Sequence, residues 1–126
     1  MAQGFAADVK QWSEKAKANV TQALHASVRE LDQEVVERTP VVTGNLRNSR
    51  EVSTLGPVEI NWTTKKFRDP SDTINNAIAG MEQGQTAWLG FRAPYARKIE
   101  ERHAFLRLAA QHWPAIVDEA ARTVTP

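Results

Sequence analysis

Residues 39 to 49 read Thr39-Pro40-Val41-Val42-Thr43-Gly44-Asn45-Leu46-Arg47-Asn48-Ser49, and the pattern of the chain changes within this stretch. Pro40 disfavours helical backbone angles at the preceding residue and therefore ends the periodic sequence before it. Gly44 tolerates a positive φ just before Leu46. The stretch thus predicts the end of a helix, then a turn, then the start of a strand.

A long amphipathic helix is predicted before this turn, from Phe5 to Arg38. Its apolar or small residues recur every three or four positions, at Phe5, Val9, Trp12, Ala16, Val20, Leu24, Val28, Leu31 and Val35. A helix of that length spans roughly 50 Å, more than the diameter of a domain of this size. Part of it should extend beyond the core, where its apolar stripe must be buried against something else; in a ring-forming protein a neighbouring subunit would be the natural candidate. A break near Lys17 to Gln22, giving two shorter helices, fits the pattern equally well.

Charges are segregated along this helix. Its first half carries Lys10, Lys15 and Lys17, and its second half carries Glu30, Asp32, Glu34 and Glu37. Glu34 and Arg38 have the four-residue spacing of a helical ion pair. The remaining carboxylates indicate a solvated face or, as the alternative, a surface for a basic partner.

The sequence after the turn predicts a small antiparallel sheet. Ser49 to Leu55 and Val58 to Trp62 are rich in β-branched and aromatic residues and are separated by Gly56-Pro57, so we expect a hairpin. Thr63 to Ser71 lacks apolar periodicity and is expected to be an exposed loop. A short helix capped by Ser71 or Asp72 and ending by Gly84 should follow, and then a strand from Thr86 to Phe91.

Helical spacing returns near the C-terminus, at Phe105, Leu108, Ala109, Trp113, Ile116, Val117, Ala120 and Val124. Pro114 removes a helical donor, so this helix should kink or restart there. Residues 1–126 are predicted to form a single α+β domain: a long N-terminal helix, a small antiparallel sheet with an inserted short helix, and a C-terminal helix kinked near Pro114.

Composition narrows the possible functions. The chain has 126 residues, of which 41% are hydrophobic and 25% charged, as expected of one globular domain. Its net charge of +1 gives no general attraction to nucleic acid or anionic membranes. It contains no cysteine, which fits a reducing cytoplasm. We expect no secretion signal and no membrane-spanning segment.

Residues able to support catalysis do not converge in the sequence. Phosphate-binding loops, dinucleotide fingerprints and serine-nucleophile elbows are absent. Glu100 and His103 could share a helix face, with His112 as a distant third metal ligand, but this spacing is too short a pattern to be specific. We therefore expect no enzyme activity, no cofactor and no metal.

Two basic stretches and four tryptophans could contribute to binding. Lys65, Lys66 and Arg68 lie beside Trp62 and Phe67, and a second stretch contains Arg92, Arg97, Lys98, Arg102 and Arg107. Interleaved aromatic residues could stack on bases while the cations contact phosphates. The tryptophans are Trp12, Trp62, Trp88 and Trp113, and most are expected in the core, with one or two at subunit contacts.

The stretch from Thr39 to Ser49 also resembles the "TPV-x-TG-x-LR-x-S" signature of small head-to-tail joining proteins of tailed bacteriophages, often called tail-completion or neck proteins. The stretch from Thr86 to Glu100 resembles the strand and "APYA-x-x-x-E" phrase of the same family. The matching residues are Pro40, Thr43, Gly44, Leu46, Arg47, Tyr95, Ala96 and Glu100. Family members often carry a Gly-rich excursion next, whereas this chain lacks the usual glycine after Glu100.

The resemblance implies a non-enzymatic virion protein that assembles as a six-membered ring at the neck or top of the tail. Its implied partners are copies of itself, neighbouring neck proteins such as a connector, stopper, tail terminator or tail tube, and DNA contacted non-specifically in the lumen. Membrane partners are not implied, and assembly would occur in the host cytoplasm. Candidate interface residues are Trp12, Lys65, Lys66 and Arg68, and Arg47 is the motif residue whose charge could reach a partner.

Three alternatives remain. The first is a tail-terminator or stopper ring of the same neck. The second is a small DNA-binding assembly protein that uses the basic loop. The third is a hydrolase, for which the sequence offers no credible nucleophile.

Overall fold

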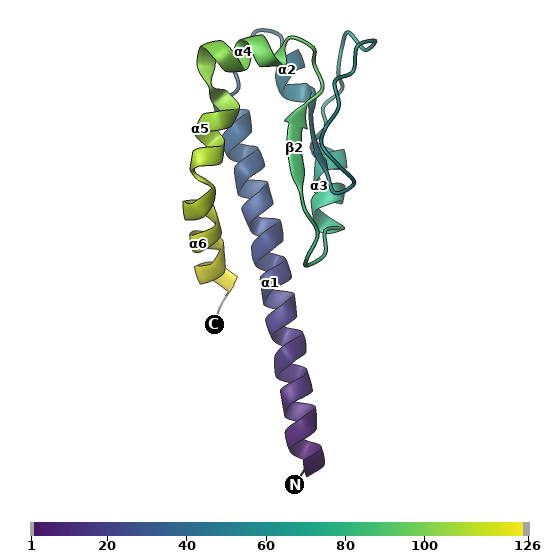
Figure 1. The fold of residues 1–126 in the computed structure, drawn as a ribbon, viewed down its shortest axis with the longest axis vertical. Helices are drawn as coiled ribbons and strands as arrows, with labels where there is room; N and C mark the ends of the chain where they lie inside the picture. The colour runs from purple at the N-terminus through teal and green to yellow at the C-terminus, as the bar shows by residue number, and fades with distance from the viewer. Residues whose placement is uncertain (1, 125–126) are drawn as a thin grey trace.

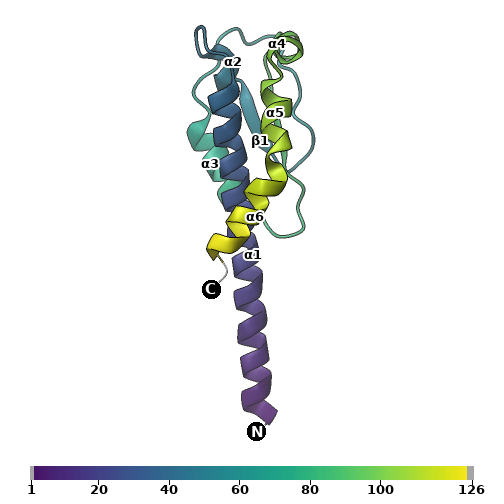
Figure 2. The same ribbon diagram turned by 90° about the vertical axis from the view of Figure 1, so that its left-hand side faces the viewer.

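The computed structural model describes residues 2–124, with side chains from residue 6 to residue 123. Helix α1 runs without interruption from Ala2 to Arg38, which confirms the predicted long helix and excludes the break near Lys17 to Gln22. The second half of α1 packs against the rest of the chain. Its first half extends beyond every other element (Figures 1 and 2). The molecule is therefore elongated along α1.

The turn after α1 contains a short helix that the sequence did not predict. The Thr39 hydroxyl donates to the Val35 carbonyl at the end of α1. Gly44 has a φ of 83° and precedes α2, which runs from Asn45 to Asn48. Strand β1 then covers Arg50–Ser53, so the strand begins just after the motif.

The sheet has two antiparallel strands, but they are not the predicted hairpin. Strand β1 pairs with β2, Trp88–Phe91, with Arg50 opposite Phe91 and Ser53 opposite Trp88. The segment from Val58 to Trp62 forms no strand, although the Asn61 N–H donates to the Arg92 carbonyl at 2.8 Å. The predicted hairpin is wrong because β1 takes its ladder from a distant strand, and the intervening segment only runs beside β2.

Helix α3, Ser71–Ala79, is inserted between the two strands, as the sequence predicted, although it ends before Gly84. After β2 the chain forms α4, α5 and α6, with bounds Ala96–His103, Phe105–Gln111 and Trp113–Val124. The expected interruption near Pro114 is confirmed. The helix is interrupted at His112, between α5 and α6. Pro114 lies in the first turn of α6, where a backbone N–H has no helical acceptor. Helices α5 and α6 lie along α1 (Figure 2).

The core consists of two clusters, of which the first includes Val28 of α1 and so holds β1 and α3 to the second half of that helix. The first is formed by Val28, Val52, Ile74, Ile78 and Met81. The second is formed by Leu46, Phe67, Ala93 and Phe105. Phe67 is 8% exposed, so the Thr63 to Ser71 loop is anchored by an apolar residue that the sequence analysis assigned to solvent.

The tryptophans are less buried than predicted. Trp12 and Trp62 are 73% and 76% exposed, and Trp88 and Trp113 are half-buried. The expectation that most lie in the core is wrong, because α1 extends past the core at Trp12 and because Trp62 lies outside the sheet. Trp113 does pack against the first cluster.

Candidate functional site

The two motif stretches meet at the side chain of Asn45. Its Oδ1 accepts a hydrogen bond from the Phe67 N–H at 2.7 Å. Its Nδ2 donates to the Tyr95 hydroxyl at 2.8 Å and to the Lys65 carbonyl at 3.1 Å. One amide therefore joins the turn after α1, the basic loop and the start of α4. Asn45 occupies a variable position of the quoted phrase, so the signature itself does not point to it.

Other motif residues pack around this junction. Leu46 is 7% exposed and belongs to the second cluster, against which Ala96 also packs. The Thr43 hydroxyl accepts a hydrogen bond from the Asn45 N–H at 3.3 Å. A small cavity of about 100 Å³ is lined by Pro40, Val42, Thr43, Gly44, Asn45, Leu46, Tyr95 and Ile99. These residues thus shape one junction between α1 and α4.

Glu100 caps the N-terminus of α5. Its Oε2 accepts from the Leu106 N–H at 2.8 Å and its Oε1 accepts from the Arg107 N–H at 3.0 Å. Ala104, between α4 and α5, has a φ of 49°. It thereby adopts the left-handed conformation that glycine occupies most easily.

An ion pair fixes β1 on α1. Arg50 Nε donates to Asp32 Oδ1 at 2.7 Å, and both side chains are largely buried. Arg50 Nη1 also donates to the Arg47 carbonyl at 3.0 Å. Asp32 therefore holds β1 on α1. It is not part of the solvated acidic face that the charge pattern of this helix indicated. The side chain of Arg47 is half-buried.

The basic loop presents its cations to solvent. Lys65, Lys66 and Arg68 are all exposed, whereas Phe67 between them is buried under the guanidinium of Arg92 at 6.0 Å from the ring centroid. Asp69 accepts from the Ser71 hydroxyl and N–H at 2.6 and 2.9 Å, and these hydrogen bonds lower the pKa of its carboxyl. The loop thus has a fixed backbone and an outward-facing positive charge.

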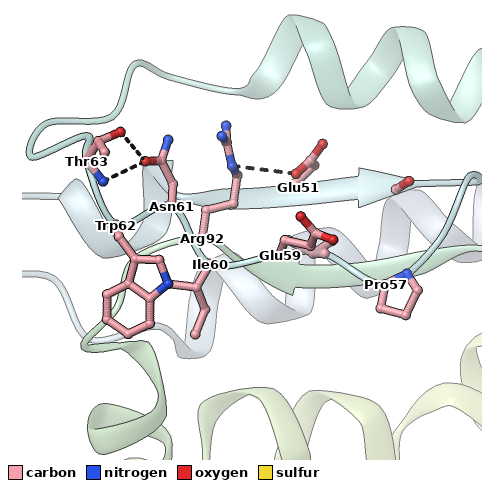
Figure 3. Close-up of a pocket in the computed structure, with 10 residues that line it drawn as sticks. Glu51, Pro57, Glu59, Ile60, Asn61, Trp62, Thr63 and Arg92 are labelled. Carbon is pink, nitrogen blue, oxygen red and sulfur yellow. Dashed lines mark hydrogen bonds and ion pairs between the residues drawn. The ribbon is translucent and has the colours of Figure 1, made fainter.

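An open hollow of about 520 Å³ lies beside the sheet (Figure 3). Arg92 Nε lies 3.7 Å from Glu51 Oε2, and Asn61 Oδ1 accepts from the Thr63 N–H at 3.0 Å. The side chains of Trp62 and Ile60 project in the opposite direction from that of Arg92 (Figure 3). The hollow thus joins an exposed indole to one partly exposed ion pair.

A second groove, of about 570 Å³, runs between α1 and α6. It is lined by Ala26, Glu30, Glu34, His112, Ala115, Ile116, Glu119, Ala120 and Thr123. Glu34 Oε2 accepts from Arg38 Nε at 3.0 Å, which confirms the predicted ion pair, and Glu34 Oε1 lies 3.3 Å from His112 Nδ1. The hydrogen bond from Arg38, followed by the contact with His112, lowers the pKa of the Glu34 carboxyl.

The weak metal candidate is not assembled. Glu100 caps α5 and His112 contacts Glu34, so these two do not share a site with His103. Among the described residues, no three histidine, cysteine or carboxylate side chains are grouped to hold a metal ion. His25 Nε2 donates to the Met81 carbonyl at 2.7 Å and so ties α1 to the chain after α3. Within residues 2–124, no helix has both the length and the hydropathy to cross a bilayer.

Comparison of the chain with protein-family models, with curated proteins and with solved structures finds no match.

Proposed function

We propose that this chain is a non-enzymatic structural protein of a long-tailed phage. It forms a ring of six copies at the head–tail junction and completes the tail or joins it to the DNA-filled head. The observation that carries the proposal is the Asn45–Tyr95 hydrogen bond of 2.8 Å, which links the two stretches that resemble the neck-protein signature. Asn45 and Tyr95, which are 50 positions apart in the chain, thus lie in one structural unit. This is expected if the two stretches belong to one signature.

The matching residues fit an architectural role. Leu46 is buried, Gly44 provides a positive φ and Glu100 caps a helix, so each stabilises the junction between α1 and the C-terminal helices. A closed ring needs two different surfaces on each copy, because every contact joins one face to another. The first half of α1 and the hollow and groove of the body supply more than one such surface.

The decisive test is deletion of the gene, followed by electron microscopy of the lysate. We expect DNA-filled heads beside free tails, with normal particles restored when the wild-type gene is supplied in trans. Abnormally long tails would instead support a tail terminator, the first alternative. Normal infectious particles without the gene would contradict both roles.

A DNA-binding assembly protein is a second candidate because three exposed cations share one loop. If Lys65, Lys66 and Arg68 each neutralise a phosphate on duplex DNA, the affinity should fall with salt at a log–log slope of about −2.7. The triple variant Lys65→Glu/Lys66→Glu/Arg68→Glu should then lose binding. Head–tail joining that survives this triple variant would remove the loop from the proposed junction contacts.

A further inference from the structure

The first half of α1 carries an apolar stripe that is left exposed by the described part of the chain. We call residues 6–20 of α1 the overhang. Val9, Trp12 and Val20 are 48%, 73% and 49% exposed, and their spacing of three and eight residues places them on one helix face. Among the side chains that the structure describes, none before Leu24 belongs to or packs against a core cluster. An exposed indole on such a stripe is typical of a contact surface.

Two lysines border this stripe on the same side. Lys10 and Lys17 are seven residues apart, so they lie two helical turns from each other along one flank. Neither has an ion-pair partner among residues 6–123. Exposed Glu14 lies on the same flank, four residues after Lys10 and three before Lys17. The overhang thus presents an apolar strip with an edge that carries two lysines and one glutamate.

The groove between α1 and α6 has the complementary chemistry. Its small and apolar lining residues are Ala26, Ala115, Ile116 and Ala120, and its acidic ones are Glu30, Glu34 and Glu119. Glu30 and Glu119 are exposed and have no ion-pair partner in the described part of the chain. The volume of about 570 Å³ lies within the range of sites that take up large side chains or ligands.

We infer that the overhang of one copy docks in the α1/α6 groove of a second copy. Trp12 lies over the apolar lining of the groove, and Lys10 and Lys17 face Glu30 and Glu119. The inference rests on the self-assembly contained in the proposed function, and it names the two surfaces that meet. Opposite charges along the contact add specificity to the apolar burial.

The occupant of the groove must come from another molecule. The groove is lined by Ala26, Glu30 and Glu34, which belong to the same uninterrupted helix as the overhang. A continuous helix cannot fold back on itself, so the overhang cannot reach its own groove. The contact is therefore between copies.

Docking of the overhang in the acidic groove joins two different faces of the two copies, which is the type of contact that closes into a ring.

The test uses two full-length charge-reversal variants. The overhang variant is Lys10→Glu/Lys17→Glu, and the groove variant is Glu30→Lys/Glu119→Lys. All four residues are exposed, and circular dichroism at a concentration below the assembly range checks that both variants fold like the wild type. Assembly is followed by sedimentation velocity over a range of protein concentrations. Matched controls, Lys98→Glu/Arg102→Glu and Glu82→Lys/Glu101→Lys, change the net charge equally at exposed positions elsewhere.

We expect the wild type and both controls to assemble in the same concentration range. Each variant alone should need a concentration higher by about tenfold or more, because like charges then meet at the contact. An equimolar mixture should recover wild-type assembly, since each overhang then finds an oppositely charged groove on the other variant. High salt should weaken assembly of the wild type.

Three results would overturn the inference: a wild type that remains monomeric throughout, a groove variant that assembles normally, or a mixture that fails to recover. These results are separate from the gene-deletion phenotype. Loss of joining in the deletion with no effect of either charge reversal rejects this contact alone. Charge-dependent assembly with normal particles in the deletion rejects the neck function alone.

Discussion

The carboxylate of Glu100 shows how one residue can end one helix and start another. Helix α4 ends at His103, and Ala104 turns the chain with a φ of 49°. The two oxygens of Glu100 then accept the N–H groups of Leu106 and Arg107 in the first turn of α5. These N–H groups have no helical acceptor of their own, so the cap stabilises the turn and orients α5 against α1.

Replacement of this cap should measurably destabilise the protein. Glu100→Ala is expected to lower the free energy of unfolding by about 1 to 2 kcal/mol, because two backbone donors lose a charged acceptor. Urea denaturation measures the change. The matched control is Glu101→Ala, whose ion pair with Arg97 is 3.9 Å long and highly exposed, and which should cost less than about 0.5 kcal/mol. Equal losses in the two variants would show that the cap contributes nothing special.

Several residue roles follow from three-dimensional contacts that a one-dimensional pattern does not contain. The motif correctly predicted a turn with a positive φ at Gly44 and the end of α1 before Pro40. It did not predict that Asn45 would bridge to Tyr95 and Phe67, because those partners are 50 and 22 residues away. Phe67 was assigned to an exposed loop because the neighbouring cations give that segment a polar composition.

Strand β2 illustrates the same limit for whole elements. A hairpin between adjacent strands was the simplest arrangement, yet β1 pairs with β2 across the inserted helix α3. The segment from Val58 to Trp62, which was expected to pair with β1, instead places Val58 against Gly90 of β2. A side chain at Gly90 would place its Cβ 2.9 Å from the Cβ of Val58. The absence of a side chain at this strand position therefore permits the close approach of the loop.

Gly90→Ala is consequently expected to destabilise the protein by about 1 to 3 kcal/mol, because the added methyl group displaces Val58 and the loop around it. Thermal denaturation provides the measurement. Gly56→Ala is the matched control, since a Cβ there meets no atom within 4 Å. An unchanged melting temperature for Gly90→Ala would show that the loop moves aside without cost.

The helices were more predictable than the sheet. Helix α1 and the interruption near Pro114 follow from local periodicity and from proline chemistry, and both are present. The partner of β1 depends on contacts between residues about 40 positions apart, for which the sequence pattern carries little information. The α1/α6 groove could not be predicted either, because it exists only once α6 crosses α1.

At the scale of the whole molecule, Glu34 connects the end of α1 with the start of α6. Its pKa is lowered first by the hydrogen bond from Arg38 and then by His112. A carboxyl whose pKa is lower in the folded state stabilises the fold above its ordinary pKa, and this contribution is lost as the pH falls through the folded value. Asp69, held by Ser71, contributes with the same sign.

Acidification below about pH 4.3, the ordinary pKa of a glutamate, should therefore reduce the free energy of unfolding. The measurement is urea denaturation across the acid range. Glu34→Gln should show a smaller dependence on pH there than the wild type, while Glu14→Gln, on the exposed overhang, should follow the wild type. A Glu34→Gln curve that coincides with the wild-type curve would contradict the assignment.

The overhang of α1 also affects the energetics of folding. A helix as short as the overhang, held only by its own backbone hydrogen bonds, is only marginally stable in water, because most helical stability in proteins comes from tertiary packing. The body half of α1 is held by the first core cluster and by the Asp32–Arg50 pair, so the two halves of one helix differ in local stability. Covering the overhang would then complete the folding of α1, which makes the helix content of the protein depend on its concentration.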